Sequence, residues 1–293
     1  MGTWLYNAGT TWILNMPEET SGKKQLNNFQ QRVLVGIAGG ALFIGGIYWS
    51  QWTFAVLFLA LTLLGIREFY QLLSLRGFSP NYNAGIVLGC ALFILVFLLQ
   101  LNLVSLSALY ALPPILFFVF ISELFRKKEQ PFVNIALTLL GMLYVGGSFS
   151  MLPILGFLNG QYSWQVIMGT LLLIWTSDSG AYFAGKTFGR HKLFPRISPG
   201  KTWEGWIGGA VFSLAVGYVL SMYLLDLALP YWLGIALIVS IFGVLGDLIE
   251  SLLKRSLQVK DSGTIIPGHG GILDRFDSLL LVVPFIVAFL KLF

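Results

Sequence analysis

Residues 251–277 bring carboxylates, basic side chains and glycines together in a chain that is otherwise mostly apolar. The side chains in this segment that could do chemistry are Ser251, Lys254, Arg255, Lys260, Asp261, His269, Asp274, Arg275 and Asp277. Carboxylate oxygens are good ligands for divalent cations, Lys and Arg bind phosphates, and glycines let a backbone approach a ligand closely. Ionisable groups near membrane hydrocarbon are costly and usually mark a functional site. The segment therefore predicts a metal-dependent site for a polyphosphate substrate.

A polar stripe leads into this segment. Asp247, Glu250, Ser251 and Lys254 follow the spacing i, i+3, i+4, i+7, so they share one face of a helix. Such a stripe near the end of a membrane helix must face a water-filled cavity or protein partners. Asp247 lies deepest in the apolar sequence and is the most costly to bury. The alternative is a structural ion pair of Asp247 or Glu250 with Lys254.

The glycine-rich loop after the stripe can carry Asp274 back to Asp247. Two carboxylates, phosphate oxygens and water would complete an octahedral Mg²⁺ shell. Zinc is not expected, because the chain has one cysteine and two histidines. Asp277 could instead cap a helix, and His269 could either shape the loop or contact a ligand. We expect Asp247 and Asp274 to bind Mg²⁺, and the sequence leaves a second cation open.

A second polar group lies upstream, around residues 178–205. Asp178 interrupts a long apolar run, so it should face a cavity, unless it forms a buried hydrogen bond. Ser198 and Lys201 follow in the run Ile197-Ser-Pro-Gly-Lys-Thr-Trp-Glu-Gly205. Hydroxyl and ammonium groups beside flexible backbone suit phosphate binding, although basic residues here could also anchor the protein at lipid headgroups.

Composition places these residues in a membrane protein. The chain is 56% hydrophobic and 11% charged, against about 25% charged in soluble domains. We predict an all-α polytopic fold with about nine transmembrane helices, because a bilayer needs about 20 apolar residues per helix. The predicted spans are 33–49, 52–72, 84–100, 104–124, 132–152, 164–185, 205–225, 231–253 and 277–293. Residues 1–30 are predicted to be a flexible polar segment, and 31–293 a single transmembrane catalytic domain.

The positions of the basic residues predict how the helices are oriented in the membrane. With the N-terminus in the cytoplasm, 17 of the 18 Lys and Arg fall in cytoplasmic segments, and only Lys291 falls outside. This is the positive-inside rule, and it puts every charged motif on the cytoplasmic side. The net charge of +5 is explained by topology and anionic ligands, so nucleic acid is not an expected partner. Cys90 is the only cysteine, which excludes a disulfide within the chain.

Residues 251–277 resemble the signature of the phosphatidate cytidylyltransferase (CDP-diacylglycerol synthase) family. The shared pattern is Ser-x-hydrophobic-Lys-Arg, then Lys-Asp-x-small, then His-Gly-Gly, then Asp-Arg-hydrophobic-Asp, and this chain has it with matching spacing. The block from Asp178 to Gly205 is also similar. The resemblance covers about 30–293, loosely in the first four spans.

The resemblance implies that CTP and phosphatidate give CDP-diacylglycerol and diphosphate with Mg²⁺, at a cytoplasmic site in a bacterial inner membrane. It also implies a homodimer in contact with membrane lipids. By position, it makes Asp247 and Asp274 the metal ligands and Asp277 a supporting acid. The other residues implied at the catalytic or substrate site are Asp178, Ser198, Lys201, Lys254, Arg255, Lys260, Asp261, His269 and Arg275.

Two other functions fit parts of the pattern. A transporter of an anionic substrate would also place charges at membrane depth, but such sites lie near the midplane and often between internal repeats. Here the charges gather at one face, and the sequence has no evident repeat. A CTP-dependent lipid kinase would use similar groups but would transfer the γ-phosphoryl group, so its product distinguishes it.

Overall fold

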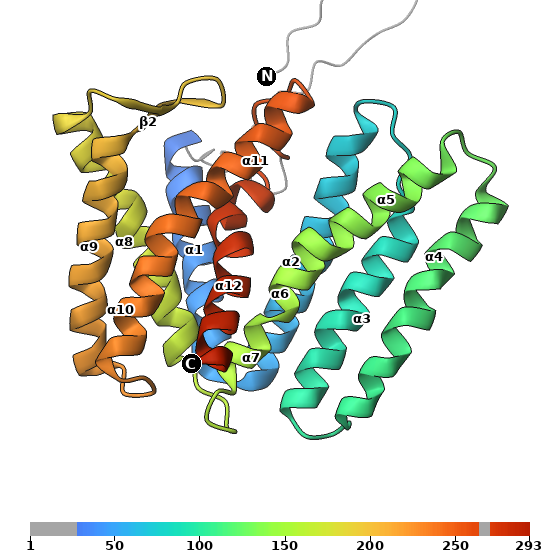
Figure 1. The fold of residues 1–293 in the computed structure, drawn as a ribbon, viewed down its shortest axis with the longest axis horizontal. Helices are drawn as coiled ribbons and strands as arrows, with labels where there is room; N and C mark the ends of the chain where they lie inside the picture. The colour runs from blue at the N-terminus through green and yellow to red at the C-terminus, as the bar shows by residue number, and fades with distance from the viewer. Residues whose placement is uncertain (1–27, 264–269) are drawn as a thin grey trace, which may run out of the picture.

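A computed structural model of the protein describes residues 28–263 and 270–293. Most of the predicted N-terminal segment 1–30 lies outside the described residues, and so does His269. The described residues form a bundle of helices, and one short β-hairpin lies at one end of this bundle (Figure 1).

The helices follow one another with short connections. They are α1 (Asn28–Trp49), α2 (Gln51–Ser74), α3 (Tyr82–Gln100), η1 (Leu106–Ala111), α4 (Leu112–Arg126), α5 (Pro131–Gly141), η2 (Met142–Gly147), α6 (Ser148–Ser150), α7 (Leu152–Gly156), α8 (Gln165–Phe188), α9 (Trp203–Tyr223), α10 (Leu229–Ile238), η3 (Val239–Gly243), α11 (Val244–Ser256) and α12 (Leu273–Leu292). Of these, η1 is a 3₁₀-helix, whereas η2 and η3 are π-helical turns.

The strands β1 (Lys192–Phe194) and β2 (Ser198–Thr202) pair antiparallel, with Lys192 opposite Thr202. The prediction of an all-α fold is therefore corrected to nearly all-α. Sequence patterns missed this hairpin because its strands are short and lack the alternation of apolar and polar residues by which strands are predicted.

The helical segments of the described chain follow the nine predicted spans in order, and two of these segments contain a π-helical turn. Seven segments are long and apolar enough to cross a membrane: Gln51–Ser74, Tyr82–Gln100, Leu106–Arg126, Pro131–Gly156, Gln165–Phe188, Trp203–Tyr223 and Leu229–Ser256. The described apolar part of α1 is the shorter stretch Gly39–Trp49. The chain is thus an integral membrane protein, and the count of nine spans stays a prediction.

Serine and proline residues determine where two of the helices begin. Ser50 ends the α1–α2 turn and caps α2, because its side chain accepts a hydrogen bond from the backbone N–H of Thr53 at 3.2 Å. Pro113 and Pro114 lie in the first turn of α4, where proline is tolerated, so this helix begins only at Leu112. These residues fix the short turn between α1 and α2 and the start of α4.

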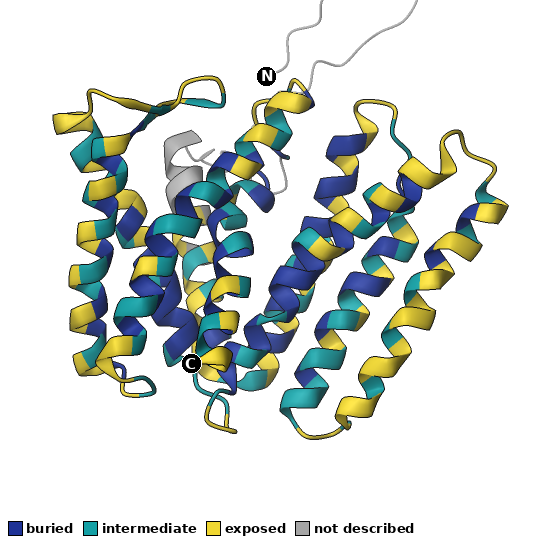
Figure 2. Ribbon diagram, in the orientation of Figure 1, coloured by how far each residue is buried: buried dark blue, intermediate teal, exposed yellow. Residues whose placement is uncertain are grey.

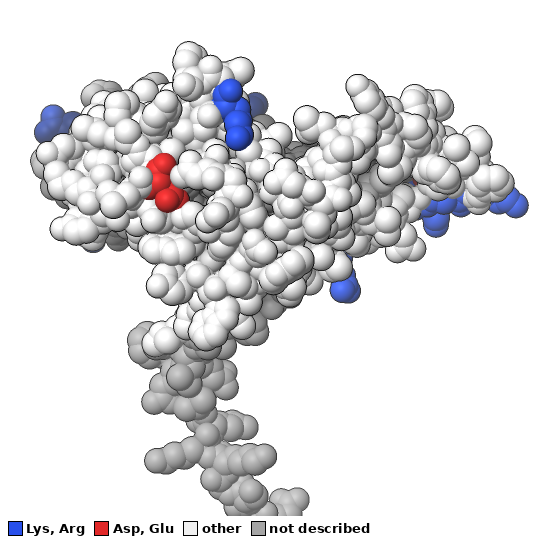
Figure 3. All heavy atoms as spheres, turned by 90° about the horizontal axis from the view of Figure 1, so that it is seen from below, with Lys and Arg blue, Asp and Glu red and all other residues white. Residues whose placement is uncertain are grey.

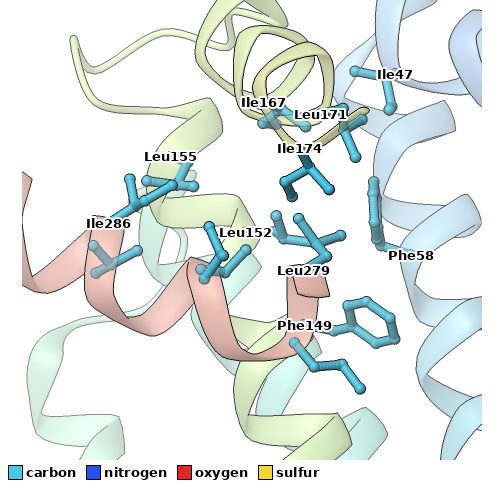
Figure 4. Packing of buried hydrophobic residues seen from close by; sticks show 14 of the residues in the cluster. Ile47, Phe58, Phe149, Leu152, Leu155, Ile167, Leu171, Ile174, Leu279 and Ile286 are labelled. Atoms are coloured by element: carbon cyan, nitrogen blue, oxygen red, sulfur yellow. The ribbon is translucent and has the colours of Figure 1, made fainter. Parts of the chain in front are cut away.

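Helix α12 lies inside the bundle, and the main hydrophobic core forms around it (Figure 4). The labelled core residues come from α1, α2, α6, α7, α8 and α12: Ile47, Phe58, Phe149, Leu152, Leu155, Ile167, Leu171, Ile174, Leu279 and Ile286. Exposed residues lie mainly on outward helix faces, most clearly along α4 (Figure 2). Many of these are large and apolar, as expected of a surface in contact with lipid.

Glycines let α8 and α9 approach closely. A Cβ atom on Gly205 would lie 2.8 Å from the carbonyl oxygen of Ala181, and one on Gly208 would overlap the side chain of Ala184. Small residues at such interfaces let helix backbones pack closely in membranes. The packing fixes the hairpin, which connects these two helices.

We expect Gly208→Ala to lower the free energy of unfolding by about 1–3 kcal/mol, because the added methyl group overpacks the interface. Gly45→Ala in α1 is the matched control, because nothing lies within 4 Å of its Cβ position. Thermal unfolding of the purified protein in detergent measures the effect. Equal midpoints for the two variants would contradict this view of the α8–α9 contact.

The basic connections lie at one end of the bundle. The hairpin, the end of α11 and the connections 75–81 and 127–130 lie at the upper end in Figure 1. The connections 101–105, 157–164 and 224–228 lie at the lower end and contain no Lys or Arg. Seen from below, the molecule shows few charged side chains, most of them at its margin (Figure 3).

Candidate active site

A cavity of about 530 Å³ that is lined in part by charged side chains lies between α8, the hairpin, α9 and the start of α11. Its charged and hydroxyl-bearing lining residues are Asp178, Tyr182, Lys186, Ser198, Lys201, Thr202 and Asp247. We call this cavity the basic pocket. It brings together Asp178, Ser198, Lys201 and Asp247, four of the residues predicted from two separate parts of the sequence.

Lys201 and Asp247 form an ion pair across this pocket. The Nζ atom of Lys201 lies 2.6 Å from Oδ2 of Asp247, and the Ser251 hydroxyl donates a hydrogen bond to Oδ1 at 3.2 Å. The sequence-based alternative of a structural pair between Asp247 and Lys254 is therefore wrong. The pair connects β2 to α11, so the hairpin is part of the site.

The hairpin is fixed at its base by Glu204 in the first turn of α9. The Glu204 carboxylate accepts hydrogen bonds from the backbone N–H groups of Arg190 and His191, at 3.1 and 3.2 Å. The Thr202 side chain caps α9 by accepting a hydrogen bond from the N–H of Gly205 at 3.2 Å. These contacts hold Lys201 at the rim of the basic pocket.

Close packing of α11 and α12 brings Asp277 near the pocket. A Cβ atom on Gly246 would lie 2.6 Å from the carbonyl oxygen of Asp277, and the Ser278 hydroxyl donates to the carbonyl of Gly243 at 3.1 Å. The π-helical turn η3 directly precedes this contact, and such turns are common at functional sites. Asp277 consequently interacts electrostatically with Asp247, Asp178 and Lys201.

Lys254 belongs to a second charged group, farther along α11. Its Nζ atom lies 2.5 Å from Glu250 and 2.6 Å from Asp274, so it joins α11 to α12. This agrees with the alternative of a structural pair between Glu250 and Lys254, and Glu250 is almost fully buried. Since the Lys254 side chain is 13% exposed and contacts two carboxylates, its charge is largely compensated within the protein.

Asp274 lies in the first turn of α12, surrounded by donors. Its Oδ2 atom accepts hydrogen bonds from the backbone N–H groups of Ser262 and Gly271, at 2.9 and 3.0 Å, and from the Ser262 hydroxyl at 2.8 Å. Lys254 donates to its Oδ1 atom. Donors of this kind stabilise an ionised carboxylate.

The predicted metal ligands thus have separate basic partners, Lys201 for Asp247 and Lys254 for Asp274. Within residues 28–263 and 270–293, no three acidic, His or Cys side chains are grouped closely enough to hold a metal ion. A shared ion between the two aspartates stays a prediction.

An apolar cavity of about 460 Å³ adjoins the basic pocket between α1, α2, α8 and α12. Its lining is mostly apolar, for example Phe43, Leu61 and Ile174, with Arg275, Asp277 and Asp178 as its charged residues. We call it the apolar pocket. Asp178 lines both cavities, so the basic pocket and the apolar pocket meet at this carboxylate.

The sequence pattern of this site is that of known enzymes, since the model of the cytidylyltransferase family matches residues 30–293. The chain belongs to the cytidylyltransferase family. It is 35% identical over 278 residues to a phosphatidate cytidylyltransferase of Bacillus subtilis (strain 168), which covers 91% of this chain and 99% of the relative. It is 37% identical over 251 residues to a phosphatidate cytidylyltransferase of Staphylococcus saprophyticus, covering 83% and 90% of the two chains.

Not every predicted residue of this cytidylyltransferase lines a cavity. Arg255, Lys260 and Asp261 are exposed on and after the end of α11. Arg275 is exposed at the apolar pocket, and His269 lies outside the described residues. Substrate contacts of these five residues remain predictions.

Sequence reasoning missed Glu68, a buried residue of α2 that is only 1% exposed. Its carboxylate accepts hydrogen bonds from the backbone N–H groups of Ile272 and Leu273, at 2.8 and 3.0 Å, and from the Ser262 hydroxyl. The available signal was an acid inside a long apolar run, the same signal that singled out Asp178.

Proposed function

We propose that the protein transfers a cytidylyl group from CTP to phosphatidate, forming CDP-diacylglycerol and diphosphate. The observation that best supports this is the meeting of the basic and apolar pockets at Asp178. A reaction between a water-soluble triphosphate and a membrane lipid needs such neighbouring compartments. The names of the relatives agree with the reaction.

The chain's own residues would work mainly by positioning and charge. The phosphate of phosphatidate is already an anion near neutral pH, so its attack on the α-phosphorus of CTP needs little help from a base. Lys186 and Lys201 line the basic pocket, where they would bind the triphosphate and offset its charge. Because the Lys201 ammonium is held by Asp247 on α11, little reorganisation is needed during the reaction.

Mg²⁺ is part of the proposal, with Asp247 and Asp274 as its ligands and Asp277 as a supporting acid. The donor set fits a hard cation, because carboxylate oxygens are its preferred ligands and both aspartates already bind ammonium groups. The Asp247 side chain is 38% exposed at the pocket and therefore accessible. When bound, the ion would neutralise phosphate charge and ease the departure of diphosphate. A second cation would extend this set.

The proposed topology has nine spans with the N-terminus and the hairpin in the cytoplasm. It is supported by the basic connections at one end of the bundle and by connections without Lys or Arg at the other. The site would then open to cytoplasmic CTP and, through the apolar pocket, to the inner leaflet of a bacterial plasma membrane. We also propose that the protein is a homodimer surrounded by lipid.

Isotope tracing with purified protein, phosphatidate and Mg²⁺ tests the function. Radioactive CTP labelled at the α-phosphorus should yield labelled CDP-diacylglycerol, and CTP labelled at the γ-phosphorus should yield labelled diphosphate. Transfer of the γ-label to lipid, with release of CDP, would instead identify a lipid kinase. Competition by unlabelled ATP, GTP and UTP would measure selectivity for the base.

We expect Lys201→Met to raise the apparent KM for CTP by about tenfold or more, because a charged contact to phosphate is lost. The KM for phosphatidate should change less. Lys254→Met serves as comparison, because Lys254 contacts Glu250 and Asp274, and its effect should fall mainly on kcat. An unchanged KM for CTP in Lys201→Met would remove Lys201 from the triphosphate site.

A further inference from the structure

We infer that Glu68 of α2 is a positioning residue for the reaction, and that it sets the placement of Asp274 from outside the signature segment. The inference rests on the proposed function, because it assigns Glu68 a part in that reaction. Glu68 touches neither pocket among the described residues. It would act through the connection between α11 and α12.

Glu68 binds the start of α12 through hydrogen bonds. Both carboxylate oxygens of Glu68 accept backbone N–H groups of this helix, from Ile272 at 2.8 Å and from Leu273 at 3.0 Å. The first N–H groups of a helix have no partner within the helix, and a carboxylate there satisfies them and complements the helix dipole. Asp274 is the next residue, so Glu68 fixes the turn that carries it.

The hydroxyl of Ser262 links Glu68 to Asp274. It donates to Glu68 or to Asp274, since both carboxylates lie within hydrogen-bonding distance of the same oxygen. Ser262 is 4% exposed. Moving the Glu68 carboxylate would therefore change the contacts of Asp274 through a single buried side chain.

Two glycines pack closely on the Glu68 carboxylate. A Cβ atom on Gly263 would lie 2.9 Å from Glu68, and one on Gly271 would overlap its carboxylate. Only glycine lets the backbone pass so closely at these two points. The two described ends of the α11–α12 connection thus converge on Glu68.

Arg76, in the turn that follows α2, holds the beginning of the same connection. Its Nε atom donates to the carbonyl of Leu257, at the end of α11, at 2.8 Å. Glu68 of α2 therefore contacts the connection at Ser262 and at the start of α12, and Arg76, just after α2, contacts it at Leu257. We call these two residues the α2 anchor.

The test compares Glu68→Gln with Glu123→Gln in lipid nanodiscs. Glu123 is a matched control, because it is also buried, at 4% exposure, and pairs with Arg126 at 2.7 Å and Asn134 at 3.1 Å, between α4 and α5. Each variant is measured for kcat, for KM of CTP, for thermal midpoint, and for hydrogen exchange of the amides at 272–274.

In Glu68→Gln, kcat should fall by about tenfold or more, because an amide cannot accept these bonds with the strength of a carboxylate. The KM for CTP should stay within about twofold, and exchange at 272–274 should rise by about tenfold. Glu123→Gln should lower the thermal midpoint while kcat and exchange at 272–274 stay unchanged. Normal kcat in Glu68→Gln, or equal kcat losses in the two variants, would overturn the inference.

If Glu68→Gln does not fold, Ser262→Ala tests the inference instead. This variant removes only the hydroxyl that links the carboxylates of Glu68 and Asp274. A fall in kcat of about threefold or more supports the link, and a wild-type kcat refutes it. Hydrogen exchange does not depend on turnover. If the wild type makes no CDP-diacylglycerol, the proposed function fails, while exchange at 272–274 still tests the anchor.

Discussion

Asp247→Asn is expected to slow CDP-diacylglycerol formation by roughly a thousandfold while leaving the protein folded. Asp247 is the carboxylate of α11 that lines the basic pocket and binds Lys201 at 2.6 Å. Asparagine keeps the shape but loses the charge that a cation and Lys201 both need. Steady-state assays with phosphatidate, CTP and Mg²⁺ measure the effect.

The fold should tolerate this change because both partners are partly exposed, Lys201 at 23% and Asp247 at 38%. An ion pair in that environment contributes on the order of 1 kcal/mol or less. Asp226→Asn is the control, since Asp226 lies between α9 and α10 at the opposite end of the bundle. Activity near that of the wild type in Asp247→Asn would exclude Asp247 from metal binding.

Asp274→Asn should lose both activity and stability, which distinguishes it from the Asp247 variant. Asp274 is 13% exposed and accepts bonds from Lys254, Ser262 and Gly271. The change removes one of the two carboxylates that compensate the buried Lys254 charge, at a cost of up to about 3 kcal/mol. Lys254 still pairs with Glu250 in this variant. Unfolding should therefore remain cooperative, with a lower thermal midpoint.

The rate of Asp274→Asn, corrected for the folded fraction, should fall by roughly a hundredfold or more. Thermal unfolding in detergent and rate measurements on the same preparation give both quantities. A large loss of stability with a normal rate per folded molecule would show that Asp274 is only a structural link between α11 and α12. It would then have no part in binding a metal.

The membrane fold and much of the site were predictable, because both depend on local patterns. Apolar runs place helices, and a charge such as Asp178 inside such a run is costly unless it faces a cavity. Helical spacing correctly put Asp247 and Ser251 on one face, where they hydrogen-bond.

The partners of these residues were not predictable, because they come from elements far apart in the sequence. Lys201 reaches Asp247 from a hairpin whose strands are too short for a periodic signal. Glu68 lies 204 residues before Ile272, so only the packing of α2 against the α11–α12 connection reveals its role. The turn η3, which precedes Asp247, likewise has no clear sequence signature.

The location of bound nucleotide decides whether the basic pocket is the triphosphate site. We would determine the structure of the purified protein with Mg²⁺ and a CTP analogue in which a methylene group replaces the oxygen between the α- and β-phosphorus. We expect the triphosphate to lie in the basic pocket, hydrogen-bonded to Lys201, with an ion at Asp247. Nucleotide bound elsewhere, with the Lys201–Asp247 pair intact and the pocket empty, would contradict it.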